Sequence, residues 1–136
     1  MYSIPGSHGW RVRVDGSIAN ANRLIEAENS PFNDPPPPGL QYFIIKVTIR
    51  YTGRGSSIWW QDLTFLALGR SNVAYDYSAD CGLTPNELGD SKHVYSGGTQ
   101  RGNICFAVKK TDLSSLLLLV EPVFSIEDVE KFFRVR

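Results

Sequence analysis

The sequence carries no excess of charge of either sign. Its 136 residues include 14 Lys and Arg and 14 Asp and Glu, so the formal net charge at pH 7 is zero. A protein that binds nucleic acid usually shows a basic excess on its binding element. Here the basic residues stand singly along predicted strands, as on solvated faces, and we therefore expect no nucleic-acid partner.

Long apolar runs are also missing. The run Leu116–Val120 is far shorter than the roughly 20 residues that a membrane-spanning helix needs. The sequence contains neither a Gly-x-Ser-x-Gly nucleophile motif nor a glycine-rich phosphate loop. We expect a single domain over residues 1–136 that buries about two thirds of its unfolded surface, with residues 1–9 as a flexible N-terminal remnant.

Cysteine is scarce, with Cys81 and Cys105 as the whole complement and no Cys-x-x-Cys motif. The two histidines, His8 and His93, are far apart, so the spacing of a zinc site is absent and we expect no metal or cofactor. The cysteines suit a disulfide, two buried thiols, or a thiol nucleophile paired with His93. We favour the disulfide because neither cysteine lies in a catalytic motif and one bond accounts for both.

A structural disulfide predicts an exported protein, because cytosolic thiols are kept reduced. The N-terminal residues 1–6 have neither the basic nor the apolar region of a signal peptide. We therefore expect that a secretory or lipoprotein leader has been removed from this chain. The expected location is extracellular or attached to the cell envelope.

The predicted fold is organised around the stretch Val94–Val108, which begins with a Gly-Gly turn and then alternates in hydrophobicity. Successive strand side chains point to opposite faces, so Cys105 is predicted to lie on the outer face of its sheet. Cys81 lies in the long connection 78–93, which we expect to fold over that face and reach Cys105. The residues predicted to face the core are Ile104, Phe106 and Val108.

A second stretch, residues 40–52, has the clearest strand pattern. Its inward side is predicted to carry Phe43, Ile45, Val47, Ile49 and Tyr51, and its outward side Tyr42, Ile44, Lys46, Thr48 and Arg50. Further strands are predicted at 10–14, 58–68, 73–77, 116–121 and 131–135, with a strand or helical turn at 18–27, a turn or 3₁₀ turn at 109–115 and a capping-box turn at 125–128. These short strands predict an all-β, immunoglobulin-like antiparallel β-sandwich of about seven to nine strands, with at most short helical turns.

Four consecutive prolines, Pro35–Pro38, cannot donate hydrogen bonds to a strand ladder. Residues 34–39 are therefore predicted to lie on the surface. We favour a stiff connection across one end of the sandwich over a recognition site for a proline-binding groove.

Two groups of side chains are candidates for binding. The acidic connection carries Asp76, Asp80, Glu87, Asp90 and His93, but it lacks the spacing of a calcium loop, and we favour a solvated loop over a cation site. Trp59 and Trp60 are adjacent, so on a strand one of them faces outward. Together with Tyr75 or Tyr77, that tryptophan could contact a sugar or a protein partner, although a cross-strand pair that only stabilises the sheet is the favoured reading.

Four segments in this order resemble a widespread group of bacterial immunoglobulin-like domains of unknown function, related to the sandwich of a mycobacterial secreted antigen. They are Asn29-x-x-Phe32-Asn33 with the prolines and Gly39, the strand ending in Tyr51-Thr-Gly53, the hairpin 62–75, and Gly97-Gly-x-x-x-Gly-x-x-Cys-Phe-x-Val108. The resemblance implies a secreted protein or lipoprotein and brings no active site.

We therefore expect a non-catalytic extracellular module for recognition or spacing at the bacterial cell surface, with an unknown protein or an envelope glycan as partner. The alternatives are a thiol-dependent enzyme that uses the Cys81 and His93 region, and an envelope-polysaccharide binder that uses exposed Trp and Tyr side chains.

Overall fold

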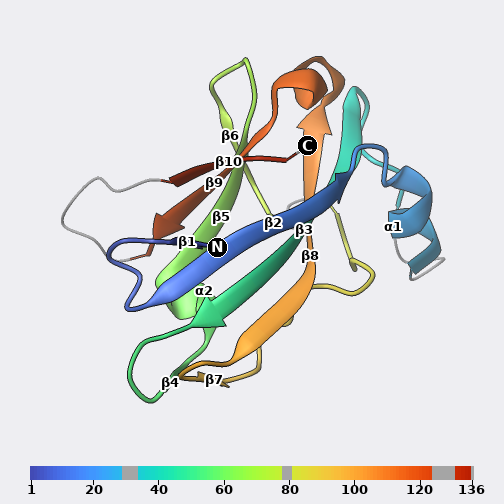
Figure 1. Ribbon diagram of the computed structural model, residues 1–136. Coiled ribbons are helices and arrows are strands. Elements are labelled where there is room, and N and C mark those ends of the chain that lie inside the picture. Colours follow the sequence, from blue (N-terminus) through green and yellow to red (C-terminus); the bar gives the residue numbers. More distant parts are fainter. Residues whose placement is uncertain (29–33, 78–80, 124–130, 136) are drawn as a thin grey trace.

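Two antiparallel sheets of four strands each form the body of the protein, as the two layers of Figure 1 show. The computed structural model describes residues 1–28, 34–77, 81–123 and 131–135. In spatial order the first sheet contains β1 (Tyr2–Ser3), β2 (Trp10–Ile18), β3 (Leu40–Tyr51) and β8 (Thr99–Lys109). The second contains β10 (Lys131–Arg134), β9 (Leu117–Pro122), β5 (Leu63–Leu68) and β6 (Ala74–Asp76), and a small ribbon pairs β4 (Ser56–Ser57) with β7 (Val94–Tyr95).

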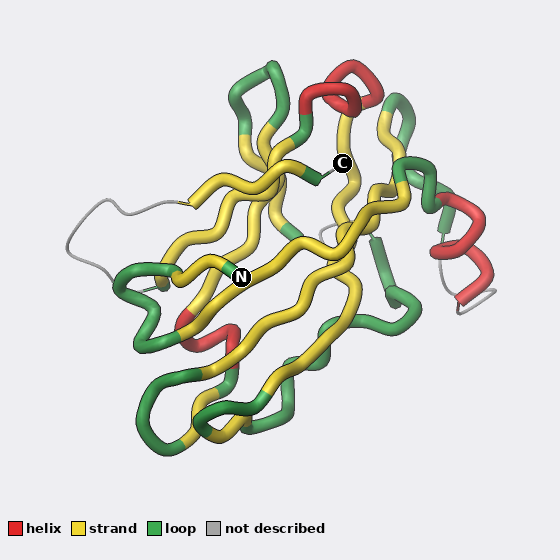
Figure 2. Tube along the Cα trace, viewed as in Figure 1, coloured by secondary structure: helices red, strands yellow, loops and turns green. Residues whose placement is uncertain are grey.

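Within the described residues, helical structure is confined to short pieces, as the colouring of Figure 2 makes plain. They are α1 (Asn22–Glu28), α2 (Trp59–Asp62) and the 3₁₀ helix η1 (Lys110–Ser115). Seven of the described strands are longer than two residues, and all of their ladders are antiparallel. The predicted all-β antiparallel sandwich is therefore confirmed.

The core between the sheets has the predicted composition. Phe43 lies opposite Phe106 and Ile45 opposite Ile104 in the β3–β8 ladder, and all four are at most 2% exposed. Val47, Ile49 and Val108 are buried with them, and Phe133 and Val135 close the core from the C-terminal strand. Alternation along β3 and β8 therefore predicted the inner face of the first sheet correctly.

The segment 58–68 differs from its prediction as one strand, because Trp59–Asp62 forms one helical turn before β5 begins. Successive side chains are about 100° apart on a helix, whereas on a strand they point to opposite faces. The turn therefore lets both indoles reach adjacent carbonyls: Nε1 of Trp59 donates to Gly89 O, and Nε1 of Trp60 to Asp90 O, each at 2.7 Å.

Residues 1–9, expected to be a flexible remnant, pack onto the first sheet instead. Tyr2 pairs with Val12 in β1–β2, and Ile4 and Ser7 are buried. The hydroxyl of Ser7 donates to Ile4 O at 2.5 Å, which closes the turn between β1 and β2. The physical reason is an apolar residue, Ile4, that the two sheets can bury.

Four other segments have outcomes to compare with their predictions. The ambiguous stretch 18–27 ends β2 at Ile18 and then forms α1, while residues 110–115 form the 3₁₀ helix. The proline segment 34–39 lies at the surface as predicted, since all but the half-buried Pro36 are exposed. The predicted turn at 125–128 lies outside the described residues.

Candidate functional site

A disulfide between Cys81 and Cys105 joins the long connection to the outer face of the first sheet. The two Cα atoms are 6.3 Å apart, and the cysteines are separated by 24 positions. The predicted bond is therefore confirmed, and both cysteines are used in it. His93 lies on an exposed part of the connection, where its Nδ1 is 3.4 Å from the hydroxyl of Ser56, so it is not paired with a free thiol.

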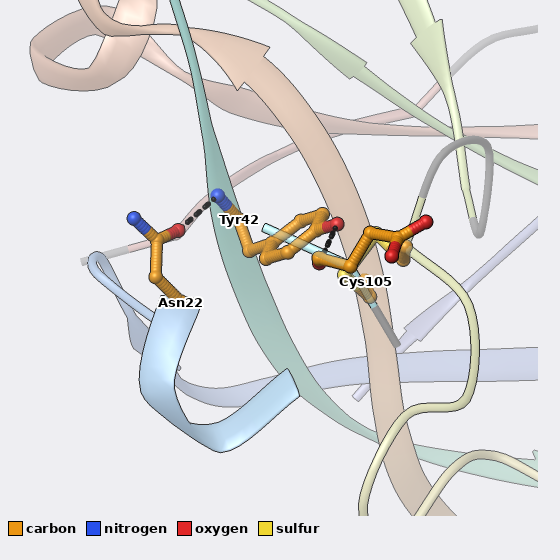
Figure 3. The surroundings of a disulfide bond; sticks show 5 residues. Asn22, Tyr42 and Cys105 are labelled. Atoms are coloured by element: carbon orange, nitrogen blue, oxygen red, sulfur yellow. Dashed lines mark hydrogen bonds between the residues drawn. A yellow bond between two sulfur atoms is a disulfide. The ribbon is translucent and has the colours of Figure 1, made fainter. Parts of the chain in front are cut away.

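A second, smaller core surrounds this bond on the outer face. Tyr42 stands between α1 and the disulfide, with its backbone N–H donating to Asn22 Oδ1 at 2.9 Å and its hydroxyl to Asp34 O at 2.8 Å (Figure 3). The cluster consists of Ala21, Ile25, Tyr42, Ile44, Cys81, Cys105 and Ala107. Strand alternation predicted that Tyr42 and Ile44 point outward, and this is correct. Both are nevertheless buried, because α1 and the connection cover that half of the outer face.

The connection also pairs with the edge of β8. The backbone N–H of Leu88 donates to Asn103 O at 2.9 Å, and that of Asn103 donates to Asn86 O at 2.8 Å. These bonds form a short parallel bridge between Glu87 and Asn103. The side chain of Asn103 adds a hydrogen bond to Pro85 O at 2.8 Å. The segment 85–88 is therefore held to the sheet by backbone pairing as well as by the disulfide.

The four aromatic residues predicted as ligand contacts do not form one exposed surface. Trp59 is buried, and its ring lies 5.6 Å from that of half-buried Tyr77, so these two belong to the packing of the sandwich. Burial and the nearby charges of Asp90 and Glu87 raise the pKa of the Tyr77 hydroxyl. Among the four, Trp60 alone is largely exposed, at 46%.

Tyr75 takes part in a polar network that sequence reasoning missed. Its hydroxyl donates to Oδ2 of Asp112 at 2.6 Å, and the hydroxyl of Ser71 donates to the same oxygen at 2.7 Å. Asp112 has no solvent-exposed surface, and the hydrogen bonds from Tyr75 and Ser71 hold its pKa below the ordinary value. The network joins η1 to β6 and to the turn before it, so its role is structural. The only signal for this network in the sequence is Asp112 beside the two serines of residues 110–115.

Asp62 forms a similar buried junction near the other end of the sandwich. It accepts hydrogen bonds from Trp10 Nε1 at 2.8 Å and from the Ser57 hydroxyl at 2.5 Å, and its other oxygen is 3.0 Å from His8 Nδ1. These contacts bind the N-terminal segment to α2. The single aspartate thus connects the segment 8–10 to the segment 57–62, more than 50 positions away in the sequence.

The acidic connection does not assemble a metal site in the part of the chain that the structure describes. No group of three or more His, Cys, Asp or Glu side chains converges there, and Asp80 lies outside the described residues. Burial, with Asp90 nearby, raises the pKa of Glu87. No helix of the described ranges is both long and apolar enough to cross a membrane.

The open half of the first sheet's outer face is polar and slightly hollowed. A depression of about 340 Å³ lies over β3 and β8, beside the connection. Arg13 Nε donates to Asp15 Oδ1 at 2.7 Å, and the buried Thr48 hydroxyl donates to Asp15 Oδ2. Burial alone would raise the pKa of Asp15, but these bonds and the charges of Arg13 and Arg101 lower it overall. The residues lining the depression are Asp15, Lys46, Val47, Asn86, Arg101, Gly102 and Asn103.

No family model matches the chain, and no curated protein matches it in sequence. Solved structures do resemble it in fold. The secreted protein MPT63 of Mycobacterium tuberculosis aligns with a TM-score of 0.55 and 17% identity, over 92% of this chain and 80% of that one. A conserved hypothetical protein of Bacillus anthracis aligns with a TM-score of 0.60 and 9% identity, over 98% and 94% of the two chains.

An uncharacterised β-sandwich protein of Clostridium difficile aligns with a TM-score of 0.53 and 12% identity, over 94% of this chain and 86% of that one. At these identities the likeness establishes the fold. The chain therefore has the β-sandwich fold of MPT63 and of β-sandwich proteins of unknown function, as the sequence resemblance predicted.

Proposed function

We propose that this protein is a non-catalytic recognition module that works outside the cell, at the bacterial surface. The observation that carries this proposal is the Cys81–Cys105 disulfide and what it anchors. A structural disulfide persists in an oxidising compartment and is rare among cytosolic proteins. The secreted status of MPT63, a protein of the same fold, supports the same location.

Recognition, rather than spacing alone, is supported by how firmly the connection is held. The disulfide, the pairing of Leu88 with Asn103 and the indole contacts to Gly89 and Asp90 hold residues 81–90 against the sheet and α2. A surface that is already ordered binds a partner without the entropic cost of ordering it. The protein therefore presents a preformed surface built from a loop and a sheet face.

The proposal is tested first by the state of the cysteines. The protein is recovered from the culture medium and the envelope fraction of its source organism. It is alkylated in denaturant, with and without prior reduction, and its mass is measured by mass spectrometry. We expect two alkyl groups only after reduction. Two alkyl groups without reduction would remove the argument for an oxidising compartment and would favour the thiol-dependent enzyme.

Exposed Trp60 supports the envelope-polysaccharide alternative, because an exposed indole offers a flat apolar surface to a sugar ring. Titration of the Trp60→Phe variant and the unaltered protein with envelope glycans, followed by tryptophan fluorescence, tests this alternative. A change that requires Trp60 would support it, and a change that persists without Trp60 would count against that residue as the contact.

A further inference from the structure

Five basic side chains that stand apart in the sequence gather on one face of the first sheet. The three strands that carry them, β2, β3 and β8, are neighbours in the sheet (Figure 1). Each of these side chains is exposed, on the open half of the outer face that α1 leaves uncovered. The residues are Arg11, Arg13, Lys46, Arg50 and Arg101.

The strand register places them close together. Arg11 lies directly opposite Arg50, while Arg13 and Arg101 both lie opposite Thr48, one on each side of it. Neighbouring strands are about 4.8 Å apart, and alternate residues of one strand are about 6.8 Å apart. The five charges therefore occupy a field of roughly 10 by 14 Å, which we call the basic face.

Few acidic residues lie on or beside the basic face to neutralise its charge. Asp15 accepts hydrogen bonds from Arg13 and Thr48, and its lowered pKa keeps it ionised. Glu87 is bridged to Asn103 at the edge of the sheet. Five basic residues against Asp15 leave an excess of four positive charges, or three with Glu87 included, although the whole chain is neutral. The charges of the molecule are therefore strongly segregated.

The shape and composition of the basic face narrow the class of partner. Single-stranded nucleic acids are usually held by aromatic side chains that stack on bases. The exposed residues in the rows of paired strand positions that form the basic face include no aromatic side chain. They are Arg11, Arg13, Asp15, Lys46, Arg50, Thr99 and Arg101. A membrane surface would call for exposed apolar side chains beside the cations, and these rows offer none. What remains is a broad, rigid array of guanidinium and ammonium groups beside a hollow of about 340 Å³.

We propose that the basic face binds a linear anionic polysaccharide of the cell envelope, through charge-assisted hydrogen bonds from its arginines to acidic groups of successive sugars. Guanidinium groups bind carboxylates and phosphates in paired hydrogen bonds, and a flat sheet matches an extended chain. Asn86, beside the hollow, adds an exposed amide group for sugar hydroxyls. This proposal rests on the extracellular location proposed above.

The test measures binding of polygalacturonate, which carries one carboxylate per sugar, by isothermal titration at low salt. Its fully methyl-esterified form has the same backbone without charge and is the matched control ligand. We expect binding of the charged polymer, strong weakening by added salt, and no measurable binding of the ester. Equal binding of the two polymers, or none of the charged polymer, would overturn the inference.

Variants locate the surface. In Arg50→Gln with Arg101→Gln, affinity is expected to fall roughly tenfold or more, because two charge-assisted contacts are lost. The control, Arg70→Gln with Lys110→Gln, removes the same charge from exposed positions at the η1 end and is expected to retain affinity. Unchanged thermal unfolding shows that both double variants are folded. An equal loss in the two would indicate a general charge effect and contradict the basic face.

A third ligand decides between classes of polyanion. Oligothymidylate of similar length is expected to bind more weakly than polygalacturonate. Tighter binding of the oligonucleotide would contradict the polysaccharide proposal and would indicate nucleic acid as the partner. These outcomes are independent of the cysteine measurement. If polygalacturonate does not bind a protein whose disulfide is intact, only the polysaccharide proposal is rejected. Free thiols in the native protein would instead reject the extracellular location.

Discussion

Gly102 of β8 lies so close to Leu88 that a Cβ added at Gly102 would stand 2.4 Å from Leu88 Cα. The same two segments are joined by backbone hydrogen bonds through Asn103. A side chain at position 102 would therefore push the connection off the edge of the sheet. This contact explains why β8 carries a glycine in the middle of a strand, where glycine is otherwise unfavourable.

Replacing Gly102 by alanine should lower the free energy of unfolding by about 1–3 kcal/mol, the usual cost of forcing an added methyl into a packed site. Urea unfolding followed by circular dichroism measures the loss. The matched control is Gly16→Ala in β2, where an added Cβ meets nothing within 4 Å. We expect a change of at most about 0.5 kcal/mol there. Equal effects at the two positions would show that the Leu88 contact is not responsible.

Phe106→Ala should lower the free energy of unfolding by about 3–5 kcal/mol, because Phe106 is fully buried opposite Phe43. Phe132→Ala removes the same atoms from a side chain that is 47% exposed, and less than about 1 kcal/mol is expected. Both are measured by chemical denaturation at one temperature. A loss below about 1 kcal/mol for Phe106 would contradict its place in the core.

Reduction of the disulfide should destabilise the protein by roughly 3–4 kcal/mol, as expected for closing a loop of 24 residues. Hydrogen exchange should show residues 81–90 losing protection before the strands of the core, because reduction frees the connection at Cys81. A Cys81→Ser, Cys105→Ser variant controls for the reductant, and its melting temperature should not change when reductant is added. Uniform loss of protection along the chain would contradict a local role of the bond.

Asp112 should make stability depend on acid pH. Hydrogen bonds from Tyr75 and Ser71 lower its pKa from 3.8, so its contribution is fully present above the unfolded value and is lost as the pH falls through the folded value. Unfolding free energies measured between pH 7 and pH 2 should fall below about pH 4 in the unaltered protein. Asp112→Asn should be less stable at pH 7, with a shallower decline below pH 4.

The exposed Asp76→Asn substitution is the control for that experiment, and it should leave the acid-side slope nearly unchanged. A slope in Asp112→Asn identical to that of the unaltered protein would assign the acid sensitivity to other carboxylates. Rescue of neutral-pH stability by asparagine would show instead that the hydrogen bonds matter without the charge.

Local alternation was sufficient to predict the inner face of the first sheet and the face on which the disulfide lies. Val47, Ile104 and Phe106 each stand between polar or smaller residues, and successive side chains of a strand point to opposite faces, so the side that must be buried is determined locally. The opposite parity of Cys105 predicted an outer-face bond for the same reason. These features depend on neighbours along one strand.

The helical turn at Trp59–Asp62 was decided by tertiary contacts. Both indoles donate to carbonyls of the connection, and Asp62 accepts from Trp10, partners about 30 and 52 positions away in the chain. The apolar pattern of this stretch is equally compatible with a strand. Long-range hydrogen bonds chose between the two, and they leave no periodic signal in the sequence.

The basic face shows the same division between sequence and structure. The sequence alone determined that the chain is neutral, and it predicted that the basic residues, Arg50 among them, stand singly on solvated faces of strands. Their gathering within a few strand widths was decided by the tertiary structure, because the pairing of β2, β3 and β8 brings together residues as far as 90 positions apart. Net charge sums over the whole molecule, whereas a partner meets one face of it.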